Sequence, residues 1–85
     1  MLAAVYDTYA KLPGGGFLHF YVIAPAVTEV EAVRAYANEW LQSRPDKGFV
    51  SYKDCRFCHT EEMIPRWERD ISQRGYHIHE LQGCH

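Results

Sequence analysis

The pattern of apolar and polar positions predicts two strands at the start of the chain. Residues 2–9 are rich in Ala, Val and Tyr, with Asp7 as the one charge, which is typical of a strand covered on both faces. Residues 17–23 are also apolar on both faces of a strand. The run 11–16 between them contains Pro13 and three glycines, which favour a turn. The segment therefore predicts a β-hairpin with a long loop.

Residues 29–43 are predicted to form an amphipathic helix. Its apolar positions recur at helical spacing and are Val30, Val33, Ala37, Trp40 and Leu41. Thr28 and Glu31 have the spacing of a capping box, in which each side chain accepts from the other residue's backbone amide. Pro45 and Gly48 are expected to end the element.

The second half of the chain predicts one more helix and a last strand. The apolar stripe of the helix is Ile64, Trp67 and Ile71. Two starts fit: Thr60 as the capping residue, or Pro65 as the first helical residue. Gly75 is a C-terminal signal, and residues 76–81 form the last strand. Residues 49–52 fit either a short strand or an ordered loop.

The element order β-β-α-(β)-α-β predicts an α+β fold in a single domain over residues 1–85. We expect a two-layer sandwich, with the last strand in the same sheet as the hairpin and both helices packed on one face. The last strand follows a helix, so it could lie beside the first strand through a right-handed crossover.

Composition excludes several classes of protein. The chain has 85 residues, of which 47% are hydrophobic and 14% aromatic, enough for a folded core. Its net charge is -2 and it has no basic block, so nucleic acid is not an expected partner. The first residues lack the basic start and long apolar stretch of a signal peptide, and no apolar run reaches transmembrane length, so we expect no membrane partner and a cytoplasmic location. Protein partners are not indicated.

Candidate chemistry is concentrated in the last third of the chain. Three cysteines and four histidines follow residue 54: Cys55, Cys58 and Cys84, with His59, His77, His79 and His85. Cys55 and Cys58 have the spacing with which two thiolates on a tight turn bind one zinc ion. A tetrahedral site needs two more ligands, and Cys84 with His59 or His77 could supply them. The leading hypothesis is therefore a non-catalytic zinc-binding or zinc-stabilised module.

Two other interpretations of the cysteines stay open. Cys55 or Cys58 could act in a redox protein or a cysteine-based enzyme, since a helix N-terminus and a neighbouring histidine stabilise a thiolate. A nucleophilic cysteine would need a histidine oriented by a third polar group. Alternatively, the cysteines could be buried and reduced in a plain interaction domain. Covalent haem attachment requires export, and the first residues do not have the pattern of a signal peptide, so we do not expect it.

Asp7 and Thr8 interrupt an apolar strand and form a second candidate polar site. Side chains at a strand end are well placed to build a site in small α/β proteins. The alternative interpretation is that the strand gives way to its turn there, with Asp7 making a local hydrogen bond.

Three stretches together resemble a known family. They are Val5-Tyr6-Asp7-Thr8-Tyr9, Cys55-Arg56-Phe57-Cys58-His59-Thr60-Glu61, and Gly75-Tyr76-His77-Ile78 with Gly83-Cys84. This pattern is similar to that of a family of small bacterial proteins of unknown function and about the same length, and it extends over essentially the whole chain. The resemblance implies a single-domain α/β protein and no established activity.

Overall fold

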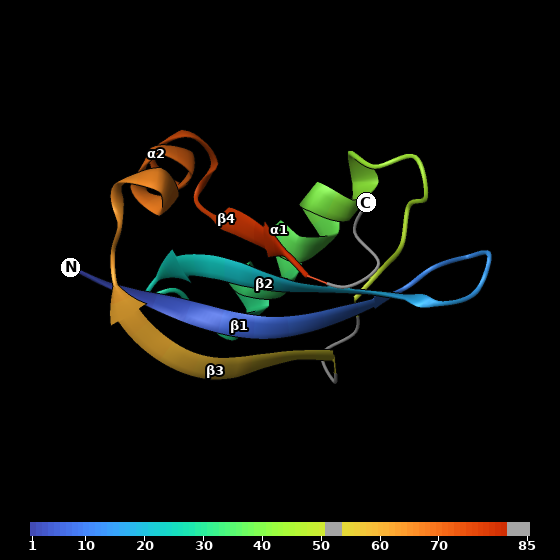
Figure 1. Cartoon of the computed structure of the whole chain (residues 1–85), viewed down its shortest axis with the longest axis horizontal. Helices are drawn as coiled ribbons and strands as arrows, with labels where there is room; N and C mark the ends of the chain where they lie inside the picture. The colour runs from blue at the N-terminus through green and yellow to red at the C-terminus, as the bar shows by residue number, and fades with distance from the viewer. Residues whose placement is uncertain (51–53, 82–85) are drawn as a thin grey trace.

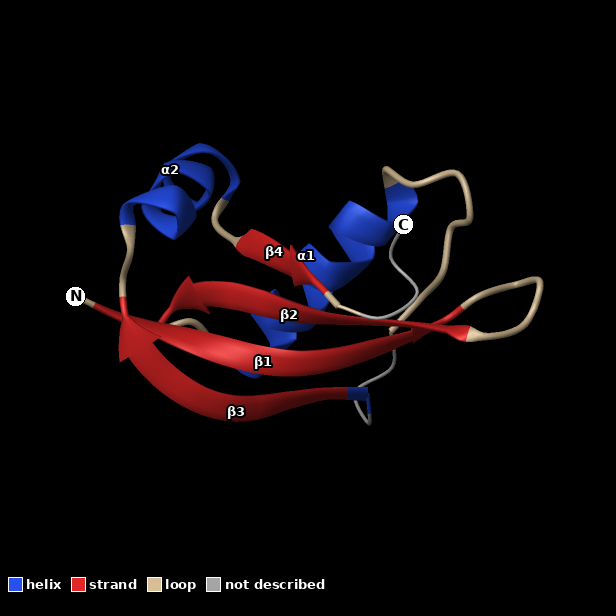
Figure 2. Cartoon of the chain, viewed as in Figure 1, coloured by secondary structure: helices blue, strands red, loops and turns tan. Residues whose placement is uncertain are grey.

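The computed structural model describes residues 1–50 and 54–81. Within these residues the chain forms one antiparallel sheet of four strands in the order β3-β1-β2-β4, with two helices (Figure 1, Figure 2). The elements are β1 (Leu2–Lys11), β2 (Phe17–Pro25), α1 (Val30–Gln42), β3 (Cys55–Glu62), α2 (Pro65–Arg74) and β4 (His77–Glu80). The predicted α+β class and element order are confirmed.

The hairpin of β1 and β2 is the centre of the sheet. Val5 pairs with Ile23 and Asp7 with Tyr21, so the odd-numbered residues of both strands share one face. The loop turns at Gly15 and Gly16, whose φ angles of 98° and 86° suit glycine. Because β1 continues to Lys11, Asp7 lies in the middle of the strand. Both interpretations of Asp7 placed it where the strand ends, whereas the strand extends two residues beyond the predicted range 2–9.

One face of the hairpin packs against α1 and forms the main core. The even-numbered residues of β1 and β2 contribute Ala4, Tyr6, Ala10, Leu18, Phe20 and Val22. From α1, the buried side chains are Val33, Ala37 and Leu41, as the predicted stripe requires. The side chain of Asn38 connects α1 to the loop that follows it. Its Nδ2 donates to the Val50 carbonyl at 3.3 Å, and its Oδ1 accepts from the Val50 N–H at 2.9 Å.

The second helix does not share that face, which corrects the expected arrangement of the helices. Trp67 of α2 packs with Met63 against Ala3, Val5 and Ile23, which point away from α1. Figure 1 shows α2 beside one end of the sheet and α1 behind the sheet. The reason is that both faces of the hairpin are apolar, and α1 covers only one.

The last strand joins the sheet beside β2 instead of β1. Ile23 pairs with His77 and Tyr21 with His79. The free edge of β1 is already occupied by β3, for example by His59 opposite Val5. The last strand therefore joins the same sheet as the hairpin, as predicted, and the possible crossover to a place beside β1 is not formed. In the segment 49–52, Phe49 makes one isolated bridge to Lys11, and residues 51–53 lie outside the described residues.

The helix ends agree with the sequence at α2 and differ at α1. Pro65 is in the first turn of α2, and Gly75 ends that helix in the left-handed region at φ 98°. The N-cap of α1 is Glu29, with no side-chain capping hydrogen bond, so the predicted Thr28 capping box is not formed. In the described ranges, neither helix is long and apolar enough to cross a membrane.

Candidate functional site

The motif Cys55-x-x-Cys58 lies in the edge strand β3 and not on a tight turn. Phe57 pairs with Tyr6 and His59 pairs with Val5, so Cys58 is an extra residue between two paired positions. This is a β-bulge, which locally bends a strand and re-aims its side chains. Cys55 is buried and Cys58 is exposed. The two thiols therefore lie in different environments.

Cys55 is part of the core beneath α1. Its side chain is 3% exposed, and its Sγ lies 3.6 Å from the hydroxyl of Thr8, which donates to the Tyr6 carbonyl at 3.1 Å. Burial raises the pKa of the Cys55 thiol, which the Thr8 hydrogen bond and the charge of Arg34 only partly offset. Cys55 is therefore a poor nucleophile and packs as a small apolar residue.

Cys58 belongs to a chain of three polar groups on β3. The Sγ of Cys58 lies 3.2 Å from Nδ1 of His59, and Nε2 of the same ring lies 2.9 Å from Oε1 of Glu61. A carboxylate only accepts hydrogen bonds, so Glu61 favours the tautomer with the proton on Nε2. Nδ1 then presents a lone pair to the thiol. This is the arrangement of a nucleophile, a base and an orienting acid.

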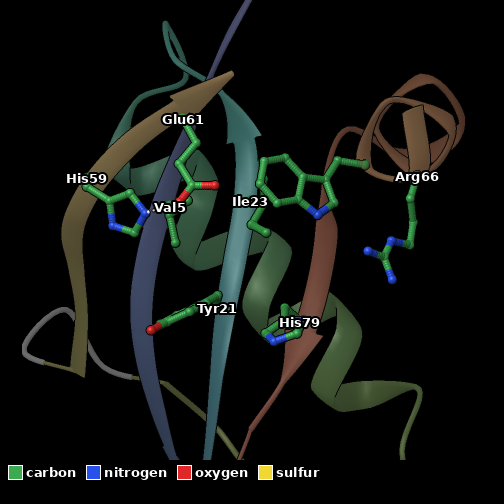
Figure 3. Close-up of a pocket in the computed structure, with 8 residues that line it drawn as sticks. Val5, Tyr21, Ile23, His59, Glu61, Arg66 and His79 are labelled. Atoms are coloured by element: carbon green, nitrogen blue, oxygen red, sulfur yellow. Dashed lines mark hydrogen bonds and ion pairs between the residues drawn. The ribbon is translucent and has the colours of Figure 1, made fainter. Parts of the chain in front are cut away.

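His59 and Glu61 also form one side of a pocket on the open face of the sheet. The pocket encloses about 180 Å³. Its lining comes from all four strands and from α2: Val5, Tyr21, Ile23, His59, Glu61, Arg66, Trp67 and His79. Figure 3 shows His59 and Glu61 on one side, Arg66 on the other, and Tyr21 and Ile23 between them. The bulge at Cys58 places His59 opposite Val5 and so on this face.

Aromatic rings and a second polar pair continue along the same face. The rings of Tyr21 and His79 are stacked at 5.9 Å, and those of Tyr9 and His19 at 4.2 Å. Nε2 of His19 lies 2.5 Å from Oδ1 of Asp7. Thr8 faces the opposite side, where it is fully buried. Asp7 and Thr8 therefore do not form a joint site.

The predicted zinc ligands are only partly brought together. Cys58 and His59 are in contact, whereas Cys55 is buried and His77 is bonded through Nδ1 to Oδ2 of Asp70 at 2.7 Å. Within residues 1–50 and 54–81, no three side chains of His, Cys, Asp or Glu form a group that could hold a metal ion. Cys84, the fifth predicted ligand, lies outside the described residues.

Several pocket residues were not identified from the sequence. The sequence predicts Tyr21 only as part of the strand 17–23 and Trp67 only as part of a helix stripe, and it gives Arg66 no role. A helix that starts at Thr60 would place Glu61 in its first turn. The strand alternation did place His19, Tyr21 and Ile23 on one face. It could not reveal that this face stays open, because that depends on where α2 packs.

The comparisons with known proteins concern the fold and not the activity. A family model described as a domain of unknown function, DUF2024, matches residues 1–81. The chain is also similar to a solved NMR structure of protein NE1680 from Nitrosomonas europaea, a structural genomics target. The two chains share 35% sequence identity over 100% of each, with a TM-score of 0.84. No functionally curated protein matches the chain.

Proposed function

The chain belongs to the DUF2024 family, and we propose that this member of it is a thiol-dependent enzyme with Cys58 as the nucleophile. One observation carries the proposal: the His59 ring contacts Cys58 through one nitrogen and Glu61 through the other, beside a pocket. A histidine held in this way satisfies the geometric requirement for an activated nucleophile.

Each of the three residues has a separate role in the proposed reaction. Nδ1 of His59 takes the proton of the Cys58 thiol, which leaves a thiolate at an exposed position. Glu61 accepts from Nε2 and stabilises the imidazolium that forms. The thiolate then attacks an electrophilic atom of a small molecule bound in the pocket. This chemistry needs a reduced thiol, and the cytoplasm, expected from the sequence, would keep it reduced.

The test is the rate at which iodoacetamide alkylates each cysteine, followed by peptide mapping near pH 7. We expect Cys58 to react at least about tenfold faster than Cys55, because Cys55 is buried and its pKa is raised. His59→Gln should lower the Cys58 rate by about tenfold, since the base is removed. Glu61→Gln should lower it by a smaller factor.

Glu62→Gln is the matched control. Glu62 is the next residue along β3 and pairs with the N-terminal amine at 3.6 Å, away from the imidazole. Its substitution should leave the Cys58 rate unchanged. An alkylation rate that is the same with and without His59 would refute the proposed role of the imidazole.

Zinc binding is the second candidate function, because Cys58 and His59 place a sulfur and a nitrogen 3.2 Å apart on one strand. Thiolates and imidazoles are the usual zinc ligands. Cys84 would have to contribute for the predicted set to be completed. Native mass spectrometry with elemental analysis of protein purified without added metal tests this: one zinc per chain, lost in Cys58→Ala, supports the candidate, and a metal-free folded chain rules it out.

A further inference from the structure

We infer that the substrate of this site is a small, elongated electrophile with a flat apolar body and an anionic group at the end farthest from Cys58. The inference rests on the proposed function, because it takes Cys58 as the reacting group. Three features of the pocket support it: the charge of its lining, the character of its floor and walls, and the order in which these follow one another.

The charge of the lining favours an anionic group at one end. Arg66 and Glu61 are the two groups of fixed charge among the lining residues. Glu61 is bonded to His59, whereas Arg66 makes no hydrogen bond or ion pair with any residue in the described part of the chain. A guanidinium that lines a pocket and has no partner is suited to bind a carboxylate or a phosphate.

The middle of the pocket is suited to a flat apolar group. Val5 and Ile23 are 2% exposed each and form an apolar floor between the two charged ends. Trp67 and Tyr21 are partly buried and supply aromatic walls, so a planar group can stack as well as bury apolar surface. The volume of about 180 Å³ accommodates a molecule of the size of a substituted benzene ring.

The order of these features gives the ligand its direction. In Figure 3, His59 and Glu61 lie over β3 at one side of the pocket, and Arg66 projects from α2 at the opposite side. Cys58 contacts His59, so the thiol also belongs to the β3 side. A molecule whose anion binds Arg66 therefore presents its other end to the thiol.

A matched pair of alkylating reagents tests this direction. 4-(Iodoacetamido)benzoate and iodoacetanilide have the same reactive group and ring, and only the first carries a carboxylate. In either reaction the Cys58 sulfur bonds to the methylene carbon, the carbon–iodine bond breaks, iodide leaves with the bonding electrons, and His59 passes the thiol proton to water. We expect the charged reagent to label Cys58 about tenfold faster, which corresponds to one charge-assisted contact.

Two variants on α2 separate the effect of Arg66 from general electrostatics. Arg66→Gln should reduce the ratio of the two labelling rates to about one. Arg69→Gln removes an exposed guanidinium from the same helix outside the pocket and should leave the ratio unchanged. The inference would be overturned if both reagents labelled the unmodified protein at equal rates. It would also be overturned if Arg66→Gln and Arg69→Gln reduced the ratio of the labelling rates equally.

Benzoate binding to Cys58→Ala keeps the two proposals distinguishable. Benzoate should shift the NMR signals of the Trp67 indole and the Tyr21 ring saturably, and Arg66→Gln should weaken this binding about tenfold. If benzoate binds in this way and His59→Gln does not change the alkylation rate of Cys58, the pocket inference holds and the nucleophile proposal fails. If His59→Gln lowers the alkylation rate and benzoate causes no saturable shift, the nucleophile proposal holds and the pocket inference fails.

Discussion

Three histidines on the open face each contact a carboxylate through one ring nitrogen, and they differ in what the other nitrogen contacts. Asp7 pairs with His19, Asp70 with His77 and Glu61 with His59. Among these rings, His59 has a thiol at its other nitrogen. A His–carboxylate pair by itself only fixes the orientation of the ring. A thiol at the second nitrogen adds a proton that the ring can accept, and its removal leaves a nucleophilic sulfur. We therefore assign the pairs of His19 and His77 to side-chain packing and to the orientation of their rings.

At the scale of single residues, Asn38→Ala should destabilise the fold. Both polar groups of the Asn38 amide bind the backbone of Val50, a residue that is 6% exposed. Removing them leaves a buried N–H and C=O without this partner, at a cost of about 1–3 kcal/mol in the free energy of unfolding. Chemical denaturation measures it, with the exposed Gln42→Ala on the same helix as the control. Equal midpoints for the two variants would contradict the prediction.

Tyr76 gives the fold a predicted sensitivity to alkaline pH. Its hydroxyl donates to Glu39 at 3.1 Å, and burial, followed by that hydrogen bond, raises the pKa of Tyr76 from 10.0 to about 12. A raised pKa means that the contribution to stability is complete below pH 10 and is lost as the pH rises through about 12. The loss is on the order of 2 kcal/mol.

The measurement is the free energy of unfolding between pH 8 and pH 12 in the native chain and in Tyr76→Phe. Phe cannot ionise, so the variant should lack this part of the alkaline loss, and the difference between the two curves should narrow above pH 10. Parallel curves over the whole range would show that Tyr76 ionisation is not coupled to unfolding.

At the scale of elements, the bulge in β3 predicts that Cys58 can be deleted without unfolding the chain. The residues on either side already pair in regular order, Phe57 with Tyr6 and His59 with Val5. Deletion should therefore change the free energy of unfolding by less than about 1 kcal/mol and keep His59 on the open face. Deletion of Thr60, which pairs with Ala4, is the contrasting variant, because it shifts Glu61 to the other face.

Unfolding curves and the NMR shifts of His59 check this pair of deletions. If deletion of Cys58 lowered the free energy of unfolding more than deletion of Thr60, the bulge itself would be needed to hold β3 in register. The same deletion also gives a folded chain without the proposed nucleophile, which complements Cys58→Ala in the benzoate-binding experiment.

A second expectation at this scale concerns the start of α1. The sequence spacing Thr28-x-x-Glu31 predicts that Thr28→Ala costs about 1 kcal/mol through loss of a cap. In the structure Glu29 is the N-cap and no side chain caps the helix. We therefore expect Thr28→Ala to change the free energy of unfolding by less than about 0.5 kcal/mol, the usual range for a residue without such a role. If chemical denaturation showed a decrease of about 1 kcal/mol in the free energy of unfolding, Thr28 would cap the helix after all.

Sequence patterns predicted those elements that are rich in apolar positions. The hairpin follows from two runs that are apolar on both faces, separated by a turn with Pro13 and three glycines. α1 follows from apolar positions at a period of 3.6, and the ends of α2 follow from Pro65 and Gly75. The third strand was expected at residues 49–52 and lies at Cys55–Glu62, because an edge strand with mostly exposed side chains has no apolar alternation to recognise. Its polar run Cys55–Glu62 therefore fitted a loop and a helix start equally well.

The candidate site was predictable in its residue types and not in its geometry. A thiol followed by a histidine indicated possible chemistry, and Cys58 and His59 do meet. The third member, Glu61, becomes recognisable only when residues 59 and 61 are known to share one face of a strand. The pocket requires Trp67 and Arg66 from α2 to lie over that face, which is a tertiary arrangement that no local pattern encodes.

At the scale of the whole molecule, the two sides of the pocket are attached to the central hairpin with unequal strength. His59 and Glu61 belong to β3, which has eight residues, whereas Arg66, Trp67 and His79 belong to α2 and the four-residue β4. α2 has no fully buried residue. The side that carries Arg66 should therefore open more readily than the side that carries Cys58.

Amide hydrogen exchange tests this difference. Residues of β4 and α2 should exchange faster than those of β1 and β2, and saturating benzoate should slow exchange in α2 and β4 most, since a ligand on Arg66 stabilises the closed arrangement. Uniform protection over all four strands would contradict the proposed difference in stability.

The exposed edge of β3 has a further consequence for the behaviour of the protein at high concentration. An edge strand offers unpaired backbone groups that another chain can bind, and long, flat, apolar edges lead to aggregation. The extra residue at Cys58 bends this edge, and Arg56, Glu61 and Glu62 place charges along it. The same irregularity that brings a thiol beside His59 thus also discourages the strand from pairing with a neighbouring copy of the chain.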